Sequence, residues 1–174
     1  MPFKIHGSVA ANGGGNHAKC QNQIKMLSIH SDEHFMNQAL KEAQIAYDEG
    51  DNHVGAVVVC ENKNIAKDHN RVERLNDATA HAEMLVITAA QNHLGSKYLN
   101  ECTLFVTLEP CIMCAGGLFW TQVGRLVIGA QDKERGYSRF NGNILHPKTD
   151  LKVGVEANAC EGIIKDFFKK LRGN

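Results

Sequence analysis

A helical spacing of apolar residues begins about thirty residues into the chain. Ser31 and Asp32 are both suitable N-cap residues, and Gly50 is a suitable residue to end a helix. Between them the apolar positions recur at intervals of three and four residues, at Met36, Ala39, Leu40, Ala43 and Tyr47. The pattern predicts a first helix that packs one face on a core.

After this helix, short apolar runs alternate with helical segments. Residues 54–60 (VGAVVVC) are apolar on both faces, which is typical of a central strand, and residues 65–69 are expected to return antiparallel to them. Further strands are expected at 102–108, 125–130 and 151–156, and helices at about 80–91, 111–120 and 158–171. A hairpin followed by alternating helices and strands predicts an α/β fold with three layers, α/β/α: a mixed five-stranded sheet with helices on both faces.

The chain of 174 residues has the length of one domain. Residues 1–30, which include ANGGGNH, show no apolar periodicity, and we interpret them as a disordered or weakly ordered leader. Residues 31–174 are expected to form the single folded domain.

Charge and cysteine content limit the possible function. The 19 Lys and Arg residues balance the 19 Asp and Glu residues, so any RNA contact must be local, without the overall positive field of a non-specific nucleic-acid binder. We expect no membrane contact, since no apolar run approaches the roughly 20 residues that cross a bilayer. Six cysteines without a secretion signal are expected to be reduced, which favours a cytoplasmic protein.

Two short motifs carry the candidate chemistry. Cys111 and Cys114 are three positions apart in the first turn of a predicted helix, and His81 and Glu83 begin an earlier one. One imidazole and two thiolates form a ligand set that suits zinc. Because the sequence offers no further cysteine or histidine pair with suitable spacing, we expect one coordination position to stay open for water.

Glu83 is expected to act beside the metal and not on it. It follows His81 by two residues, about 200° around a regular helix, which is a poor position for a second ligand of the same ion. Zinc lowers the pKa of its water to about 7, and a neighbouring carboxylate can move the proton that the water loses. The pattern therefore predicts a catalytic zinc, with Glu83 as the proton carrier.

Each motif has a simpler interpretation when taken alone. A cysteine pair at this spacing can form a disulfide or a redox couple, and a lone His-x-Glu occurs by chance. A scaffold protein that keeps zinc only for folding is a further alternative. Glu83 argues against a scaffold, because a purely structural site has no use for an acid beside an open position.

The motifs His81-Ala82-Glu83 and Pro110-Cys111-Ile112-Met113-Cys114 resemble the signature of the zinc-dependent cytidine/deoxycytidylate deaminase superfamily. Within it, the chain resembles the bacterial tRNA-specific adenosine deaminases from about residue 31 to residue 172. The resemblance rests on VGAVVV, HNR, DATAHAE, TLFVTLEPCIMCAGG, VGRLVIGAQD and DFF, which occur in the same order and spacing.

The resemblance implies a cytidine-deaminase-like fold and the hydrolysis of adenosine to inosine at the wobble position of a tRNA anticodon stem-loop. It also implies a homodimer with one Zn²⁺ per subunit, held by His81, Cys111 and Cys114. Asn70 is then expected to bind the nucleoside and Asp132 the neighbouring nucleotide. The backbone N–H of Ala82 is expected to bind the oxygen at C6.

The end of the last helix, KDFFKKLR, has a mixed character. The resemblance places Phe168 and its basic neighbours against RNA, and aromatic and basic side chains together suit base stacking and phosphate binding. The alternative is an amphipathic helix that docks Phe167 or Phe168 into the core.

His53 stands where the family usually carries proline. It could approach the pocket, but a lone histidine in a loop is more often expected to face solvent. A deaminase of a free base or nucleoside, such as guanine or cytosine, would use the same zinc chemistry, so the metal motifs alone do not fix the substrate.

Overall fold

The structure, a computed structural model, describes the backbone of residues 30–171 and the side chains of residues 30–166. The leader predicted for residues 1–30 therefore lies outside the described residues, apart from His30. The side chain of Phe168 also lies outside them. No helix in the described part of the chain is long and apolar enough to cross a membrane.

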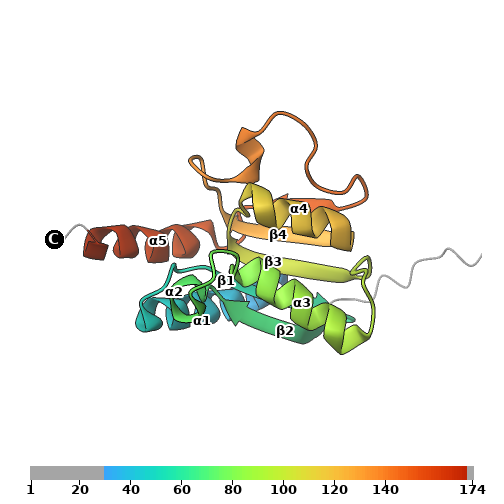
Figure 1. The fold of residues 1–174 in the computed structure, drawn as a ribbon, viewed down its shortest axis with the longest axis horizontal. Helices are drawn as coiled ribbons and strands as arrows, with labels where there is room; N and C mark the ends of the chain where they lie inside the picture. The colour runs from blue at the N-terminus through green and yellow to red at the C-terminus, as the bar shows by residue number, and fades with distance from the viewer. Residues whose placement is uncertain (1–29, 172–174) are drawn as a thin grey trace, which may run out of the picture.

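Eleven elements follow one another along residues 32–171 (Figure 1). They are α1 (Asp32–Glu49), β1 (Gly55–Cys60), β2 (Lys63–His69), α2 (Val72–Leu75), α3 (Ala82–Leu94), β3 (Cys102–Leu108), α4 (Ile112–Thr121), β4 (Arg125–Ala130), the 3-10 turn η1 (Tyr137–Arg139), β5 (Asp150–Val153) and α5 (Ala157–Leu171).

The five strands form one sheet in the order β2-β1-β3-β4-β5. β1 is antiparallel to β2 and to β3, whereas β3, β4 and β5 are parallel to one another. The predicted mixed sheet, parallel in its later part, is thus confirmed.

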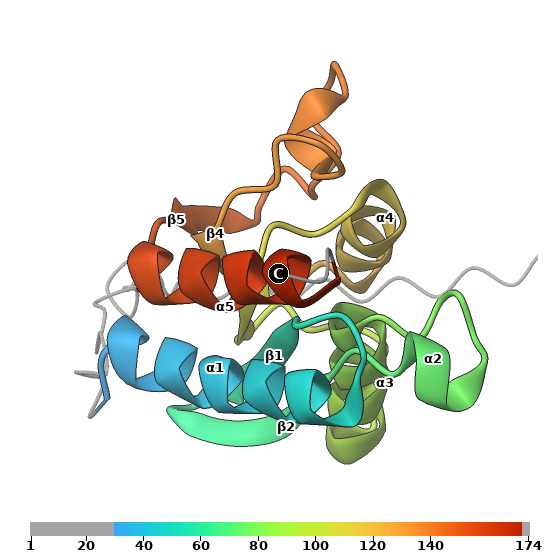
Figure 2. The ribbon, with the colours of Figure 1, turned by 90° about the vertical axis from the view of Figure 1, so that its left-hand side faces the viewer.

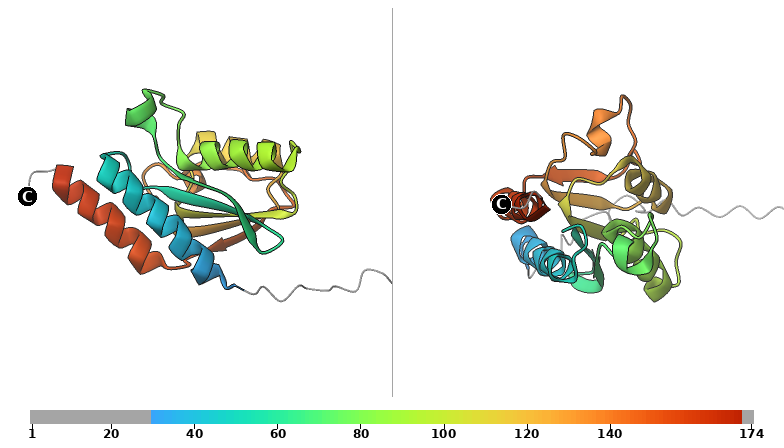
Figure 3. Two further views of the ribbon diagram at one scale, coloured as in Figure 1. Left: turned by 90° about the horizontal axis from the view of Figure 1, so that it is seen from below. Right: turned by 60° about the vertical axis from the view of Figure 1, so that its left-hand side comes forward.

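Helices cover both faces of the sheet. α1 and α5 run side by side on one face, and α3 and α4 lie on the other (Figures 2 and 3). Successive residues of β3 point to opposite cores, because Phe105 packs with Phe35 of α1 while Leu104 belongs to the core under α3 and α4. The two cores confirm the three-layer α/β/α architecture.

Element ends follow local chemistry. The Ser31 hydroxyl accepts a hydrogen bond from His34 N at 3.3 Å, and Gly50 adopts a left-handed φ of 80°, so the predicted limits of α1 are confirmed. The prediction of a strand to residue 156 is wrong, because the chain turns at Gly154, with φ 92°. The short elements α2 and η1 were not predicted, since three or four residues carry no periodicity.

The fold brings two helix starts together. α3 begins after the β1-β2 hairpin and α4 begins after β3, and both helices lie on the same face of the sheet (Figure 1). Their N-terminal ends meet near the carboxyl end of β3. The residues of the two predicted motifs are therefore neighbours in space.

Candidate metal centre and its pocket

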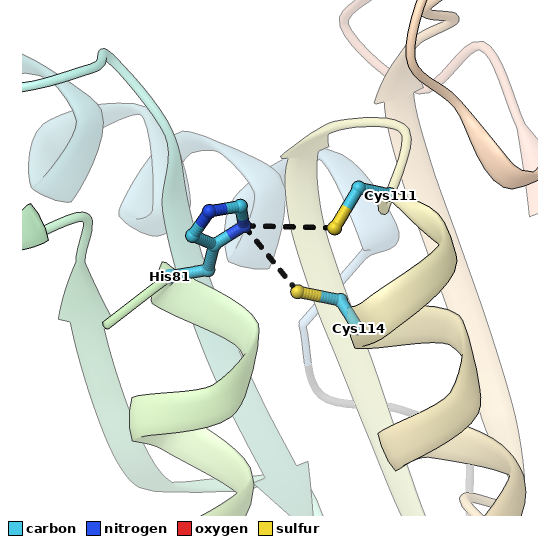
Figure 4. Close-up of side chains that lie close together, drawn as sticks. All are labelled: His81, Cys111 and Cys114. Atoms are coloured by element: carbon cyan, nitrogen blue, oxygen red, sulfur yellow. Dashed lines mark hydrogen bonds between the residues drawn. The ribbon is translucent and has the colours of Figure 1, made fainter. Parts of the chain in front are cut away.

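His81, Cys111 and Cys114 converge at these two helix starts (Figure 4). His81 is the N-cap of α3 and Cys111 the N-cap of α4, both with extended backbone, while Cys114 lies in the first turn of α4. The Nδ1 atom of His81 is 3.7 Å from the Cys111 Sγ and 3.5 Å from the Cys114 Sγ. The three ligand atoms all lie within 4.8 Å of one another.

This spacing fits a tetrahedral zinc ion. With a Zn–S bond of about 2.3 Å and a Zn–N bond of about 2.0 Å, a tetrahedral angle separates nitrogen and sulfur by about 3.5 Å. Among the described residues, no fourth His, Cys, Asp or Glu belongs to the group. The donor set is therefore that of a three-ligand site, as catalytic zinc sites have.

Contacts among the three ligands shift their pKa values in different directions. The hydrogen bond from the Cys114 thiol, followed by that from His81, lowers the pKa of Cys111 to about 3. The same contact with Cys111, together with burial, raises the pKa of Cys114. The pKa of His81 is raised, mainly by its hydrogen bond to Cys111. These contacts favour the thiolate form of Cys111, and metal binding would release the protons that the ligands still carry.

Glu83 lies in the first turn of α3 and is only 3% exposed. Burial raises the pKa of its carboxyl group to about 7, against the opposing effects of a backbone hydrogen bond and of His81. A carboxyl group with a pKa near 7 can both take and return a proton at neutral pH.

A cavity of about 470 Å³ opens beside these residues. His81, Glu83 and Cys111 line it, as do the predicted residues Asn70 and Asp132. Its remaining lining residues are Asn52, His53, Val54, Leu108, Glu109, Ala130, Gln131, Lys133, Glu134, Arg135, Glu161, Ile164 and Lys165. The cavity can thus admit a molecule of nucleobase size next to the metal ligands.

Asn70 and Ala82 are bonded to each other. The Oδ1 atom of Asn70 accepts a hydrogen bond from the backbone N–H of Ala82 at 2.9 Å. The N–H that was expected to bind a substrate oxygen is therefore engaged by the protein. Asn70 retains its Nδ2 amide group as a donor for another partner.

Asp132 also has partners within the protein. Its Oδ1 atom accepts hydrogen bonds from the backbone N–H groups of Glu134, at 2.9 Å, and Arg135, at 3.0 Å. The carboxyl group thus shapes the loop after β4 at the border of the cavity.

His53 and Glu109 are pocket residues to which the sequence analysis gave no functional role. The expectation that His53 faces solvent is wrong, because its side chain is 4% exposed. Its Nδ1 atom is 3.3 Å from the Ile163 carbonyl oxygen of α5, and its ring lies 4.4 Å from that of Tyr47. The signal that could have placed His53 is its position directly before the buried run that begins at Val54. Glu109 is buried, and its position directly before Pro110 and Cys111 was the available signal.

Comparisons with known proteins agree with this site. Residues 29–130 match the family model described as "Cytidine and deoxycytidylate deaminase zinc-binding region". The tRNA-specific adenosine deaminase of Aquifex aeolicus is 44% identical over 146 residues, which cover 82% of this chain and 97% of the relative. The tRNA-specific adenosine deaminase of Bacillus subtilis is 40% identical over 146 residues, which cover 81% of this chain and 91% of the relative.

Solved structures show the same fold. A structure from a study of A-to-I editing by tRNA:A34 deaminases at the wobble position is 38% identical, with a TM-score of 0.70, and covers 75% of this chain and 98% of that one. A guanine deaminase structure from Bacillus subtilis is 34% identical, with a TM-score of 0.57, and the match covers 59% of this chain and 66% of that one. The tRNA deaminases are 38 to 44% identical over at least three quarters of this chain, against 34% over 59% for the Bacillus subtilis guanine deaminase, so identity favours the former group. The chain belongs to the tRNA-specific adenosine deaminase family, within the cytidine and deoxycytidylate deaminases.

Proposed function

We propose that this protein hydrolyses adenosine to inosine at the wobble position of a tRNA anticodon, with release of ammonia. The observation that carries the proposal is the meeting of a His-Cys-Cys metal cluster and a buried glutamate at one cavity. The identity of about 40% to tRNA-specific adenosine deaminases over about four fifths of the chain supports the same substrate.

His81, Cys111 and Cys114 would hold one Zn²⁺ in each subunit. When bound, the ion supplies Lewis-acid activation of a water molecule, lowering the pKa of that water to about 7. The three side chains come from rigid helix starts, so they hold their spacing without a large rearrangement.

Glu83 is the proposed proton carrier. Its carboxylate would take one proton from the attacking water and deliver it to the adenine ring nitrogen. It would then move the remaining proton of the added oxygen to the exocyclic nitrogen, which leaves as ammonia when the C–N bond breaks. Burial suits this role, because it keeps the pKa of the carboxyl group near neutral pH and limits exchange of the proton with bulk water.

Asn70, Ala82 and Asp132 are the proposed substrate contacts. Asn70 can donate through its Nδ2 amide, since its oxygen already accepts from Ala82. The backbone N–H of Ala82 would bind the substrate oxygen only after breaking its hydrogen bond to the Asn70 side chain. Asp132 lines the cavity within a loop that also carries Lys133 and Arg135.

Three cations of the cavity, Lys133, Arg135 and Lys165, are candidates to bind the phosphates of an RNA substrate. Acidic residues line the cavity as well, and Lys165 is paired with Glu161 at 2.9 Å. Such local cations can bind the phosphates on either side of a flipped base. Phe168, further along α5, is the proposed stacking partner of an RNA base, with docking into the core as the alternative.

A homodimer is the proposed assembly. Trp120 and Ile112 of α4 are 78% and 45% exposed, and Leu94 at the end of α3 is 40% exposed. Large apolar side chains in such numbers on two neighbouring helices favour a surface that another subunit covers.

The five described cysteines are free thiols, which supports a reducing, cytoplasmic location.

A deaminase of a free base or nucleoside remains the second candidate, because the Bacillus subtilis guanine deaminase shares the fold at 34% identity. The test is to incubate the protein with an anticodon stem-loop that carries adenosine at the wobble position, and with free guanine, cytosine and adenosine. Ammonia release and sequencing of the RNA are then measured. We expect adenosine-to-inosine change in the RNA at the wobble position alone, whereas ammonia from a free base only would reverse the substrate assignment.

A further inference from the structure

Glu109 lies between the end of β3 and the first metal-ligating residue of α4, and the proposed chemistry does not use it. Its side chain is only 5% exposed, and it lines the same cavity as His81 and Glu83. Carboxyl groups are seldom buried to this extent without specific partners. The partners of Glu109 therefore indicate what the residue does.

Both oxygens of Glu109 accept hydrogen bonds from the loop after β4. Oε2 accepts from the backbone N–H of Asp132 at 3.1 Å, and Oε1 accepts from that of Ser138 at 2.9 Å. Hydrogen bonds from backbone N–H groups to a carboxylate are about twice as strong as those between neutral groups. One side chain thus ties down the loop at two points.

Main-chain contacts join the same two segments. The Tyr137 N–H donates to the Pro110 carbonyl oxygen at 2.9 Å, and Cys111 forms an isolated antiparallel bridge with Gly136. The loop therefore lies directly against the segment that begins α4 and carries the first thiolate ligand.

Gly136 is required by this close approach. A Cβ atom at this position would lie 2.4 Å from the Cδ of Glu109 and 2.5 Å from the Asp132 carbonyl oxygen. Its φ of −61° is available to every residue, so space and not backbone conformation selects glycine here. The contact with Glu109 is thus sensitive to a change on either side.

The loop that Glu109 holds is also a wall of the cavity. Residues 131–135 all line it, and they include Asp132, the proposed contact with the neighbouring nucleotide, and the cations Lys133 and Arg135. The distance between these side chains and the metal ligands depends on how the loop is fastened to the start of α4.

We propose that Glu109 is a positioning residue, which fastens the pocket wall of residues 131–135 to the metal-ligating start of α4. It keeps the groups that bind the substrate at a fixed spacing from the reacting centre, where an error of about 1 Å is costly. The inference rests on the proposed function, because the wall is taken to bind RNA.

Two variants change this contact, one at Glu109 and one at Gly136. Glu109→Gln keeps one acceptor but presents an amide N–H₂ to a backbone N–H, so that one of the two hydrogen bonds is lost. Gly136→Ala introduces the clash without altering the carboxyl group. Glu101→Gln is the matched control, since Glu101 is an exposed glutamate at the opposite end of β3.

Hydrogen exchange of the peptide that covers residues 131–139 tests the fastening without any substrate. We expect exchange to be about tenfold faster in both variants, as the loss of one such hydrogen bond predicts, and unchanged in the control. Unchanged exchange in both variants overturns the proposal, whether or not the wild-type protein acts on RNA.

Kinetics on the anticodon stem-loop separate positioning from a merely structural contact. We expect KM to rise about tenfold in both variants, with kcat within about threefold of the wild-type value and the bound zinc unchanged. Faster exchange with an unchanged KM, or loss of zinc from the variants, contradicts the positioning role.

Discussion

The carboxamide oxygen of Asn70 accepts a hydrogen bond from the backbone N–H of Ala82 at 2.9 Å. This hydrogen bond links the end of the β1-β2 hairpin to the start of α3. Ala82 lies between His81 and Glu83, so this hydrogen bond fixes the backbone from which both side chains project. Both Asn70 and Ala82 are buried, at 3% and 0% exposure.

Asn70→Ala should therefore weaken both the fold and the reaction. We expect the free energy of unfolding to fall by about 1 to 3 kcal/mol, because the Ala82 N–H is left buried without an acceptor. Urea unfolding measures this loss, and Asn92→Ala, which changes an exposed asparagine of α3, is the control. Stability equal to the wild-type value in Asn70→Ala would show that the hydrogen bond has no structural role.

Glu83→Gln should separate zinc binding from catalysis. Glutamine has nearly the same shape but cannot carry a proton, so we expect kcat to fall by about 10² to 10⁴. Zinc per chain, measured by atomic absorption, should stay at the wild-type value, since Glu83 is not one of the three clustered ligands. A variant that keeps its turnover would show that Glu83 is not the proton carrier.

The metal cluster should respond to the loss of a single thiol. We expect Cys114→Ser to bind far less zinc and to be inactive, because a hydroxyl group is a poor zinc ligand beside a thiolate. Cys160→Ser changes a thiol on the opposite face of the sheet and should keep its zinc. Removal of the metal by a chelator should abolish deamination in the wild-type protein, and added Zn²⁺ should restore it.

The secondary-structure elements and the metal ligands could be predicted from the sequence, because both depend on the spacing of residues that are close together along the chain. Helical spacing and strand-like runs placed the five strands and four longer helices, and the spacing of Cys111 and Cys114 needed only one helical turn. The contacts of Glu109 and His53 could not be predicted in this way. Ser138 is 29 residues from Glu109, and Ile163 is 110 residues from His53, so these pairs exist only once the layers have assembled.

Asp32 should make the stability of the fold depend on pH in the acidic range. Arg125 of β4 binds its carboxylate through two nitrogens, at 2.7 and 2.9 Å, and Lys152 of β5 adds a third contact at 2.6 Å. The hydrogen bond to Arg125, followed by that to Lys152, lowers the pKa of Asp32 from 3.8 to about 2.

A lowered pKa means that the folded state prefers the charged form. The contribution of Asp32 is therefore complete above pH 4 and is lost as the pH falls from 4 toward 2. We expect Asp32→Asn to lower the free energy of unfolding at pH 7 by about 1 kcal/mol, after allowance for solvent screening, and to have little effect near pH 2. Urea unfolding at both pH values measures this difference. Asp150→Asn removes a more exposed partner of Arg125 and should cost less.

His53 should couple the pocket to α5. Its ring packs on Tyr47 of α1 and its Nδ1 atom contacts the Ile163 carbonyl oxygen, so one buried side chain bridges the two helices on this face of the sheet. The next two residues of α5, Ile164 and Lys165, line the cavity. His53→Ala removes the bridge, and we expect α5 to exchange its amide hydrogens about tenfold faster. KM for the stem-loop should rise with it, because Lys165 is no longer held at the border of the cavity.

His93→Ala, at an exposed histidine of α3, should leave both the exchange rate of α5 and KM unchanged. Exchange of α5 at the wild-type rate in His53→Ala would mean that this helix is held by its apolar face alone.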